Sequence, residues 1–557
     1  MTRRYRTISM QLPDLNLNTI TDPAARQVIG QLLHLIETLV AENQALRPEN
    51  QQLRDALARL KGGAGKPDIK PSTAPAPPTD HSSEQERRTT KPRQKGRKLG
   101  LLVPTRTERC VVDPALLPPD AIRSGTTEVI IQDLILQPDI IQFVREVWYV
   151  PSTGATITAA LPAGYQGEFG PHIQALTLTL GHGAHVSQPS LLTFFQDAGI
   201  AIGAGTIARW LRDHRETWVL DAQLIHHAGL ASGDWQASDQ TSTRVDGQNE
   251  TCHVLGNRYF TVYQTRPGGT RQDVLAVLWG REPVFRLNGD ALAWLEATQI
   301  SAGLRTRLTA ALPWDTVLTA ADLTTQLALA GITLGPQQRQ PVWDALAVAA
   351  YHAQTEVPII RQLLTDDAAV YHLIVDEHGL CWIHDWRHYA KLTPVVPVHQ
   401  ELLATFRADY WDYYRQLLAY RAAPTVTERD RLRATFAVLF TRRTGYQALD
   451  ERIAKTRTNQ ELLLVVLDHP DLPLHNNDME LAARRRVRKR DVSFGPQSRA
   501  GAQAWDTFQT IIATATKLGV RVYTYFLSRL MAPATTPTLA DHIRERSRAV
   551  VLVSTSA

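Results

Sequence analysis

Residues 235–265 read WQASDQTSTRVDGQNETCHVLGNRYFTVYQT and decide the fold class. Three runs in this stretch are rich in β-branched and aromatic residues: Trp235–Val245, Thr251–Leu255 and Tyr259–Thr265. The turn dipeptides Asp246-Gly247 and Gly256-Asn257 separate them, and such turns between short β-rich runs are typical of antiparallel hairpins. The stretch therefore predicts a three-stranded antiparallel meander.

Further strands and helices follow the meander. The expected elements are a helix from about Gln272, a helical region over 281–354, a buried strand Ile359–Leu364, a strand Leu380–His384, a helical region over 397–468, and helices opened by Asn477 and spanning Trp505–Leu530. This order predicts an α/β protein with a ribonuclease H-like catalytic core and two helical insertions. The pattern alone does not separate this plan from other α/β plans.

Upstream, leucines recur every seven residues. They are Leu32, Leu39, Leu46, Leu53 and Leu60. Four positions after the first four leucines lie Ile36, Asn43, Asn50 and Leu57, and Ile29 lies one heptad before Ile36. This a/d pattern predicts a coiled coil over 22–62 and a homodimer through 29–60, because Asn at an a position favours two strands. A single amphipathic helix packed on the body is the alternative. Pro48 is expected to kink or restart the helix.

Three regions link this helix to the meander. Residues 63–100 form a basic, flexible linker, either a solvated tether or a phosphate-binding arm. Residues 101–165 predict a small β-rich domain, and 166–228 a helical, helix-turn-helix-like region. The strands expected in the small domain are Glu128–Ile131, Gln142–Tyr149 and Ala155–Leu161. Two packed helices without DNA contact explain Ser190–Asp197 and Thr206–His214 equally well.

Composition excludes several classes of protein. The 557 residues carry a net charge of +5, and the three cysteines, Cys110, Cys252 and Cys381, form no CxxC pair. A disulfide framework and a zinc ribbon are therefore not expected. The N-terminus lacks the apolar core of a signal peptide, and no run reaches the ~18 apolar residues of a membrane helix. We expect a cytoplasmic, nucleoid-associated protein.

Three acidic residues are candidate metal ligands. Asp239 lies on the first strand, Asp366 directly after the buried strand, and Glu480 near the start of a helix. Phosphodiester cleavage uses divalent cations held by carboxylates, and Mg²⁺ prefers such oxygen ligands. Each residue also has a structural explanation: aspartates are common in turns, and Asn477 with Glu480 has the spacing of a capping box.

A basic run follows Glu480. Six of the seven residues over Arg484–Arg490 are Arg or Lys, and only Val487 interrupts them. A helix charged on all sides cannot be fully buried without partners, so a nearby polyanion is the favoured explanation. Ion pairs within the fold are the alternative.

Several motifs together resemble a known family. They are GEFGPHIQALTLTL and VSQPSLLTFFQDAGIAIGAGTIARWL before the meander, SDQTSTRVDG around Asp239, LLTDDAAVY and LCWIHDWRHYAKL around and after Asp366, and LPLHNNDMELAARRRVRKRDVSFG and AWDTFQTIIATATKLGV around and after Glu480. The chain is similar over most of its length to DDE transposases of the IS-sixty-six class of bacterial insertion sequences.

The resemblance implies a function and a site. Asp239, Asp366 and Glu480 would be the catalytic triad and would hold two Mg²⁺ or Mn²⁺ ions. The partners would be terminal inverted repeats, target DNA and accessory proteins encoded by the element. The residues expected to bind DNA phosphates are His384, Arg387, Lys391, Arg484, Arg485, Arg488, Lys489 and Arg490, although His384 is also consistent with a core histidine.

Two departures from the family pattern affect these expectations. Many relatives carry a cysteine zinc motif where this chain has only Cys110, so no zinc is expected there. Asp239 and Asp366 are 127 residues apart, which leaves Asp367 or Asp376 as substitutes for Asp366. The alternatives to a transposase are a ribonuclease H-like nuclease without strand transfer and an inactive or domesticated dimeric DNA-binding protein.

The sequence thus predicts ten regions. They are a coiled coil (22–62), a basic linker (63–100), a small β-rich domain (101–165), a helix-turn-helix-like region (166–228), three parts of the core (229–280, 355–396 and 474–532), two helical insertions (281–354 and 397–473) and a C-terminal tail (533–557).

Overall fold

The computed structural model describes residues 21–60, 103–118, 120–123, 125–165, 167–213 and 216–555. At its centre lies a five-stranded mixed sheet in the order β5-β4-β3-β8-β9. The strands are β3 (Trp235–Val245), β4 (Gln248–Gly256), β5 (Thr261–Arg266), β8 (Gln362–Thr365) and β9 (Glu377–Leu380). The first three pair antiparallel, and β8 pairs parallel with both β3 and β9. The predicted α/β class and the meander are confirmed.

The first turn of the meander follows from its two residues. Val245 pairs with Gln248, so only Asp246 and Gly247 connect β3 to β4, with φ of 48° and 75°. Two-residue hairpins with the twist of a sheet need positive φ at both positions, which Asp-Gly tolerates. The second connection is longer than the predicted dipeptide, since β5 begins at Thr261 rather than Tyr259.

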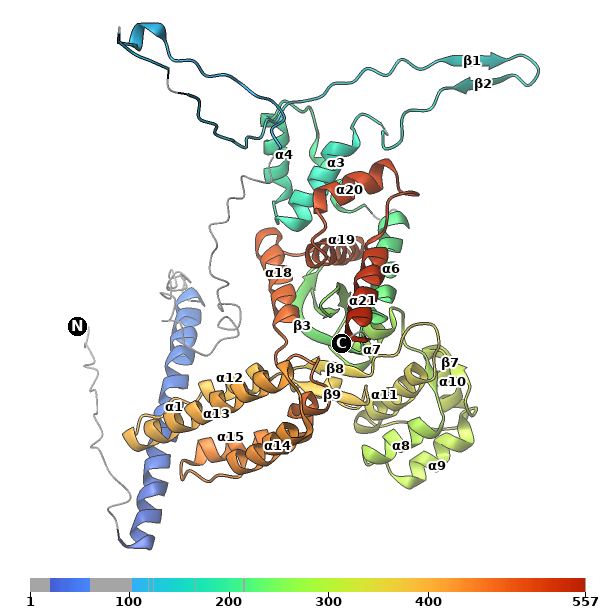
Figure 1. Ribbon diagram of the computed structural model, residues 1–557. Helices are drawn as coiled ribbons and strands as arrows, with labels where there is room; N and C mark the ends of the chain where they lie inside the picture. The colour runs from blue at the N-terminus through green and yellow to red at the C-terminus, as the bar shows by residue number, and fades with distance from the viewer. Residues whose placement is uncertain are drawn as a thin grey trace.

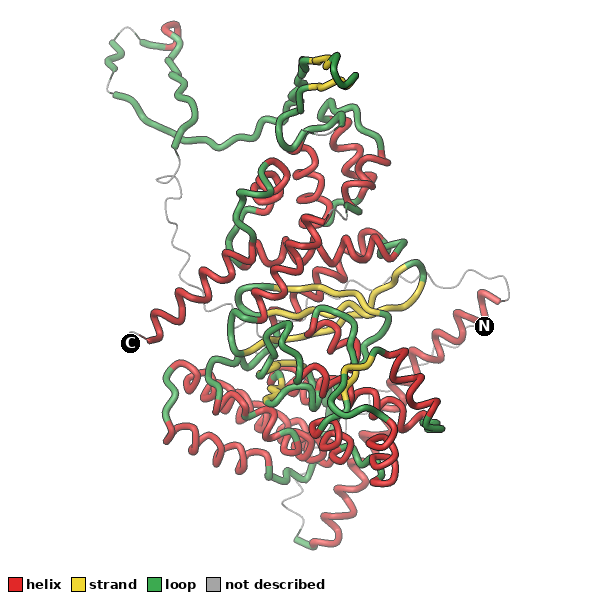
Figure 2. The backbone as a smooth tube through the Cα atoms, turned by 90° about the vertical axis from the view of Figure 1, so that its right-hand side faces the viewer, coloured by secondary structure: helices red, strands yellow, loops and turns green. Residues whose placement is uncertain are grey.

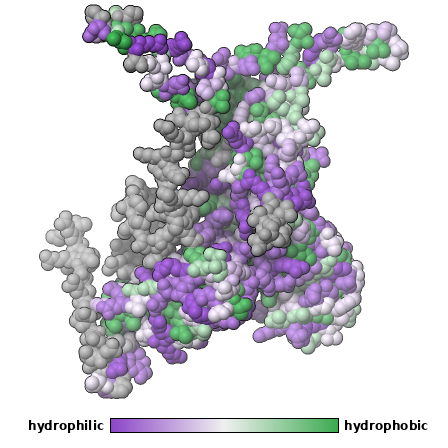
Figure 3. Space-filling model, in the orientation of Figure 1, coloured by the Kyte–Doolittle hydropathy of each residue, from purple (hydrophilic) through white to green (hydrophobic). Residues whose placement is uncertain are grey.

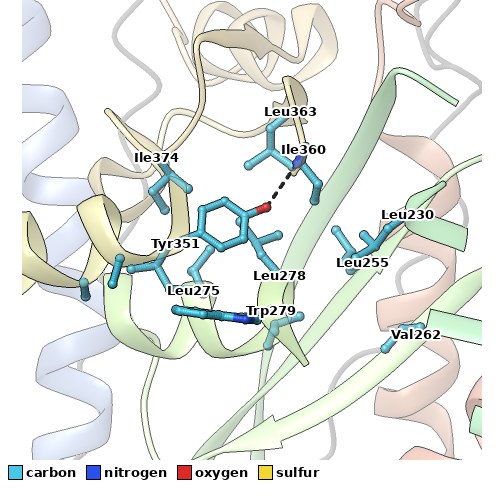
Figure 4. Close-up of a cluster of buried hydrophobic side chains, with 14 of the residues drawn as sticks. Leu230, Leu255, Val262, Leu275, Leu278, Trp279, Tyr351, Ile360, Leu363 and Ile374 are labelled. Atoms are coloured by element: carbon cyan, nitrogen blue, oxygen red, sulfur yellow. Dashed lines mark hydrogen bonds between the residues drawn. The ribbon is translucent and has the colours of Figure 1, made fainter. Parts of the chain in front are cut away.

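Helices cover both faces of the sheet (Figure 2). On one face, Ala237, Val254 and Leu364 pack with Met479 and Ala482 of α18. On the other face lies the largest core, which includes Leu255, Val262 and Leu363 (Figure 4). The helices involved in these cores are α6 (Glu216–Leu230), α7 (Arg271–Trp279), α11 (Pro336–His352), α18 (Asn477–Ser493) and α19 (Arg499–Lys517). Within the second core the Tyr351 hydroxyl accepts a hydrogen bond from the Ile360 amide at 3.1 Å, just before β8 (Figure 4).

Side chains of α19 accept hydrogen bonds from the backbone amides along the outer edge of β5. The amides of Thr261, Tyr263 and Thr265 donate hydrogen bonds at 3.2, 3.0 and 2.7 Å. Their acceptors are Thr514 Oγ1, Thr510 Oγ1 and Asp506 Oδ2, which are spaced about one helical turn apart. The edge of the sheet is therefore paired, although no strand of the described chain lies beside it.

Both helical insertions are present (Figure 1). The first contains α8 (Gly289–Ala297), α9 (Ala302–Ala311), α10 (Ala320–Leu329) and α11, and also a short pair of strands, β6 (Phe285–Arg286) and β7 (Val317–Leu318). The second contains α13 (Pro397–Ala422), α14 (Val426–Phe440), α15 (Gln447–Thr458), α16 (Gln460–Leu463) and α17 (Val465–Asp468). The second insertion shares an aromatic core with α12 (Trp382–Ala390).

The predicted N-terminal helix is α1 (Pro23–Leu60), which continues through Pro48 and does not restart there. It packs on the body through Leu33 and Glu37. Leu33 is buried, and Glu37 Oε1 accepts hydrogen bonds from the Val395 and Val396 amides at 3.0 and 3.2 Å. The heptad leucines Leu32, Leu39, Leu46 and Leu53 stay about half exposed. The helix therefore contacts the body through the face that carries Leu33 and Glu37, and the face that carries the heptad leucines stays exposed. The coiled coil stays a prediction.

The prediction of a β-rich domain over 101–165 is wrong for the described residues. Only β1 (Val147–Val150) and β2 (Ala155–Thr158) form a hairpin there, and a short helix spans Pro114–Leu116. Glu128–Ile131 forms no strand, because no second strand among the described residues lies beside it. The segment extends away from the body (Figure 1), with apolar side chains exposed along it (Figure 3). The linker at 63–100 lies outside the described residues.

The remaining helices flank the core. The helix-turn-helix-like region contains α3 (Pro171–Leu178), a π-helical turn (Thr179–Gly183), α4 (Gln188–Asp197), α5 (Ala204–Leu211) and α6. The helix predicted over Trp505–Leu530 is two helices, α19 and α20 (Val522–Met531), because Gly519 takes a left-handed φ of 63° between them. The expected tail at 533–557 is instead α21 (Leu539–Thr555), whose Leu539 and Ile543 are fully buried. In the described ranges, no helix combines the length and apolarity of a membrane span.

Candidate active site

The register of β3 and β8 brings two of the predicted acids together. Ala237 on β3 is the parallel partner of Leu364 on β8. Asp239 lies two residues farther along β3, and Asp366 follows directly after Thr365, the last residue of β8. Side chains two apart on a strand share a face. Asp239 therefore points to the same side as Ala237, which contacts α18.

Glu480 completes the cluster from α18. Met479 and Ala482 anchor this helix on the sheet, and Glu480 is 8% exposed. The N-cap is Asn476, which makes no side-chain capping bond, so the capping-box explanation of Asn477 and Glu480 is wrong. Instead, Asn476 Nδ2 donates to the Ser238 carbonyl at 2.6 Å, which joins the start of α18 to the residue before Asp239.

The three carboxylates interact electrostatically. The pKa of Asp239 is raised from 3.8 to about 7, mainly by burial and also by the nearby charges of Glu480 and Asp366, while the Gln240 amide and Arg387 oppose the rise. A buried group of like charges is costly unless a cation lies among them. The Glu480 and Asp366 carboxylates therefore repel that of Asp239, and Arg387 offsets part of this negative charge.

Arg387 and His384 of α12 lie against Glu480. Arg387 Nη2 donates to Glu480 Oε2 at 2.7 Å, and Arg387 Nη1 lies 2.9 Å from His384 Nε2. His384 Nε2 also lies 3.4 Å from Glu480 Oε1. The sequence places His384 on a strand, but β9 ends at Leu380 and α12 begins at Trp382, so His384 lies in the first helical turn.

The second insertion fixes the position of α12. Asp385 is buried and accepts hydrogen bonds from Tyr410 at 3.1 Å and Thr456 at 2.9 Å, and it pairs with Arg452. Trp382 Nε1 donates to the Leu463 carbonyl at 3.0 Å. The insertion thus supports the helix that holds Arg387 beside Glu480.

The two substitutes for Asp366 lie elsewhere. Asp367 accepts a hydrogen bond from Asn459 at 3.0 Å and lies 3.7 Å from Lys455 Nζ. Asp376 directly precedes β9, whose first residue pairs with Gln362 at the opposite end of β8 from Asp366. Of the three candidates, Asp366 is the one that raises the pKa of Asp239.

The basic run on α18 is divided between core and surface. Arg486 is 1% exposed, pairs with Asp506 and donates to Gln509 at 2.7 Å. Lys489 is 4% exposed and donates to the Gly181 carbonyl at 2.6 Å. The expectation that Lys489 lies on a DNA-binding surface is therefore wrong in this structure. The remaining predicted residues of the run, Arg484, Arg485, Arg488 and Arg490, stay exposed or half-buried, and Lys391 is exposed at the end of α12.

One residue at the site was not predicted. Cys381 is the N-cap of α12 and is buried, and its Sγ accepts a hydrogen bond from the Asn476 amide at 3.3 Å. Burial raises the pKa of its thiol to about 11. The spacing CWIH over 381–384, with Cys and His three residues apart, is the sequence signal that could have identified it.

A comparison with curated proteins shows a similarity over part of the chain. No family model and no solved structure matches the chain. A curated protein of Sinorhizobium fredii, the uncharacterized protein y4jO, is 29% identical over 310 residues. The alignment covers 55% of this chain and 94% of that protein. This chain is thus similar to a shorter protein whose name states no activity.

Proposed function

We propose that this protein is a DDE-type DNA transposase with a ribonuclease H-like core. It would cleave the ends of an insertion sequence and join the freed 3′-hydroxyl to target DNA. The observation that carries the proposal is that Glu480 and Asp366 lie near enough to Asp239 to raise its pKa, where Asp239 lies on β3, Asp366 follows the adjacent parallel strand β8, and Glu480 lies on a helix packed on the sheet.

The strand order supports the proposed core. A meander forms one side of the sheet, and two parallel strands follow on the other side of its first strand. The two acidic strand positions are adjacent in this order even though 127 residues separate them in sequence. The first helical insertion lies between β5 and β8 in the chain, so its length does not separate the carboxylates.

The donor set fits divalent cations of the Mg²⁺ class. All three groups offer carboxylate oxygens, and Glu480 Oε1 is buried without a hydrogen-bond partner. Two such cations would neutralise charge on the attacking and leaving oxygens of the phosphodiester. Arg387, at 40% side-chain exposure, is placed to hold a phosphate beside Glu480. The exposed Arg484, Arg485 and Arg488 would bind neighbouring phosphates and add salt-sensitive affinity.

The test begins with a search of the DNA that flanks the gene for inverted repeats, which are then prepared as labelled duplexes in Mg²⁺. Asp239→Asn, Asp366→Asn and Glu480→Gln should each abolish cleavage and leave duplex binding within about twofold, because each removes one ligand charge and keeps the shape. Asp367→Asn is the matched control, because Asp367 contacts Asn459 instead, and it should cleave normally.

The products separate the proposed function from its alternatives. Cleavage followed by joining to a second duplex supports a transposase. Cleavage without joining would identify a nuclease, and binding without cleavage a DNA-binding protein. Near-normal cleavage by any of the three variants would remove that residue from the active site.

A further inference from the structure

A mixed set of side chains lies beside the carboxylate cluster. Cys381, His384 and Glu480 each offer a ligand atom, and these atoms all lie within 4.8 Å of one another. Cys381 and His384 belong to the start of α12, where residues three apart lie on one side of the helix. Glu480 reaches them from α18. Two elements that are distant in sequence therefore build one pocket of potential ligands.

The set is buried and incompletely hydrogen-bonded. Cys381 is 1% exposed and Glu480 8% exposed. Glu480 Oε1 and His384 Nδ1 are buried atoms without a hydrogen-bond partner. Buried polar atoms are almost always hydrogen-bonded in folded proteins, and Glu480 Oε1 has only its 3.4 Å ion-pair contact with His384 Nε2, so a cation between these groups would supply the missing partner.

The chemistry of the donors selects the kind of ligand. A sulfur, a nitrogen and an oxygen donor suit Zn²⁺ and related cations, whereas Mg²⁺ prefers oxygen donors alone. Three protein ligands also leave one position of a tetrahedral site open. We propose that Cys381, His384 and Glu480 form a binding site for a thiophilic divalent cation of the Zn²⁺ class.

The surroundings are compatible with such a cation after a small rearrangement. Arg387 donates its hydrogen bond to Glu480 Oε2, so Oε1 can still bind a cation. Arg387 Nη1 lies 2.9 Å from His384 Nε2, so Arg387 must move if that nitrogen becomes the ligand. The Asn476 amide already donates to Cys381 Sγ at 3.3 Å and would stabilise a thiolate there. The ligand atoms must approach to about 3.5 Å from one another around Zn²⁺.

This site shares only Glu480 with the proposed carboxylate site. Cation binding here does not depend on the proposed DNA chemistry, because Asp239 and Asp366 are not ligands. If both sites exist, a bound Zn²⁺ would hold Glu480 away from the other two carboxylates. The two proposals can therefore fail separately.

The test is a titration of the full-length, metal-free protein with Co²⁺, which reports sulfur ligation by an ultraviolet charge-transfer band. We expect the band to saturate at one equivalent and to disappear on addition of Zn²⁺. Cys381→Ser should abolish the band, and His384→Gln should weaken Zn²⁺ binding by about tenfold or more in equilibrium dialysis. Cys252→Ser and Asp239→Asn are the controls. Cys252 is buried on β4 away from the set, and Asp239 belongs only to the carboxylate site, so both variants should keep the band.

The outcomes are decisive in both directions. Absence of the band in the wild-type protein, or its persistence in Cys381→Ser, would overturn the proposal. His384→Gln serves as the second variant if Cys381→Ser does not fold, since its side chain is 24% exposed. A band that is retained in Asp239→Asn, together with the absence of DNA cleavage by that variant, would support both sites at once.

Discussion

Replacing Asp239 by Asn is expected to stabilise the metal-free protein at neutral pH. Burial and two neighbouring carboxylates raise the pKa of Asp239 from 3.8 to about 7, so the folded state holds this proton more tightly than the unfolded state. The stability that the proton confers is complete below pH 3.8 and is lost as the pH rises to about 7. A pKa difference of this size corresponds to about 4 kcal/mol. Asn keeps the shape and carries no charge.

The measurement is urea unfolding in EDTA at pH 5 and pH 8, followed by tryptophan fluorescence. The variant should exceed the wild type in unfolding free energy by about 2 kcal/mol at pH 5 and about 4 kcal/mol at pH 8. Adding Mg²⁺ should narrow the difference at pH 8, because the wild type gains cation binding that the variant has lost. Asp246→Asn, an exposed turn residue of the same hairpin, is the control and should show no such pH dependence.

The reasoning would be refuted by an equal difference at the two pH values, or by a variant that is less stable than the wild type at pH 8 in EDTA. Either result would mean that burial and the neighbouring carboxylates do not raise the pKa of Asp239 in the folded protein. A stable variant whose advantage does not shrink in Mg²⁺ would leave the electrostatic argument intact and remove Asp239 as a cation ligand.

Three further predictions concern the helices. Replacing Arg484, Arg485 and Arg488 by Ala should weaken binding to all DNA duplexes about equally. The slope of log affinity against log salt should fall by about 0.9 for each phosphate that the variant no longer neutralises. An unchanged slope in a filter-binding assay would exclude DNA binding by these side chains. Lys489→Met should stabilise the fold at pH 7. Burial and the charge of Arg486 lower the pKa of Lys489 to about 7, so the stability of the wild type rises between pH 7 and 10.5. Removing the charge should raise the free energy of unfolding by about 2 kcal/mol at pH 7, after the loss of the hydrogen bond to Gly181 is subtracted. Denaturant titration at pH 7 and 9 checks the sign of this pH dependence. Replacing Leu32, Leu39 and Leu46 by Ala should lower the mass measured by light scattering from dimer to monomer, and an unchanged mass would count against pairing through α1.

The sequence predicted those parts of the fold that local chemistry determines. Asp246-Gly247 identified a two-residue hairpin because few other dipeptides accept positive φ at both positions. The strand positions of Asp239 and Asp366 did not single them out, because aspartates are also common in turns, and the hypothesis that they act with Glu480 came from the resemblance to a known family. Gly519, which divides α19 from α20, was missed because an isolated glycine within a helical pattern is often tolerated.

The errors arise where tertiary contacts decide. Six basic residues in seven indicated a surface, but Arg486 faces Asp506 and Lys489 faces a carbonyl of the preceding helical region. The capping spacing of Asn477 and Glu480 was real in sequence, yet Arg387 of α12 binds the Glu480 carboxylate instead. None of these three partners could be inferred from residues next to the motif, since they come from other segments of the chain.

The row of hydrogen bonds from β5 amides to α19 side chains has a consequence for self-association. An open strand edge is a template on which a second copy can add its own strand, and such growth has no natural end. Here Asp506, Thr510 and Thr514 take the place of that added strand. Four residues of a helix advance about 6 Å and two residues of a strand about 7 Å, so the two repeats drift apart by about 1 Å per rung and the match lasts only a few rungs. The helix therefore ends the sheet on this side with a pairing that cannot be copied from one molecule to the next.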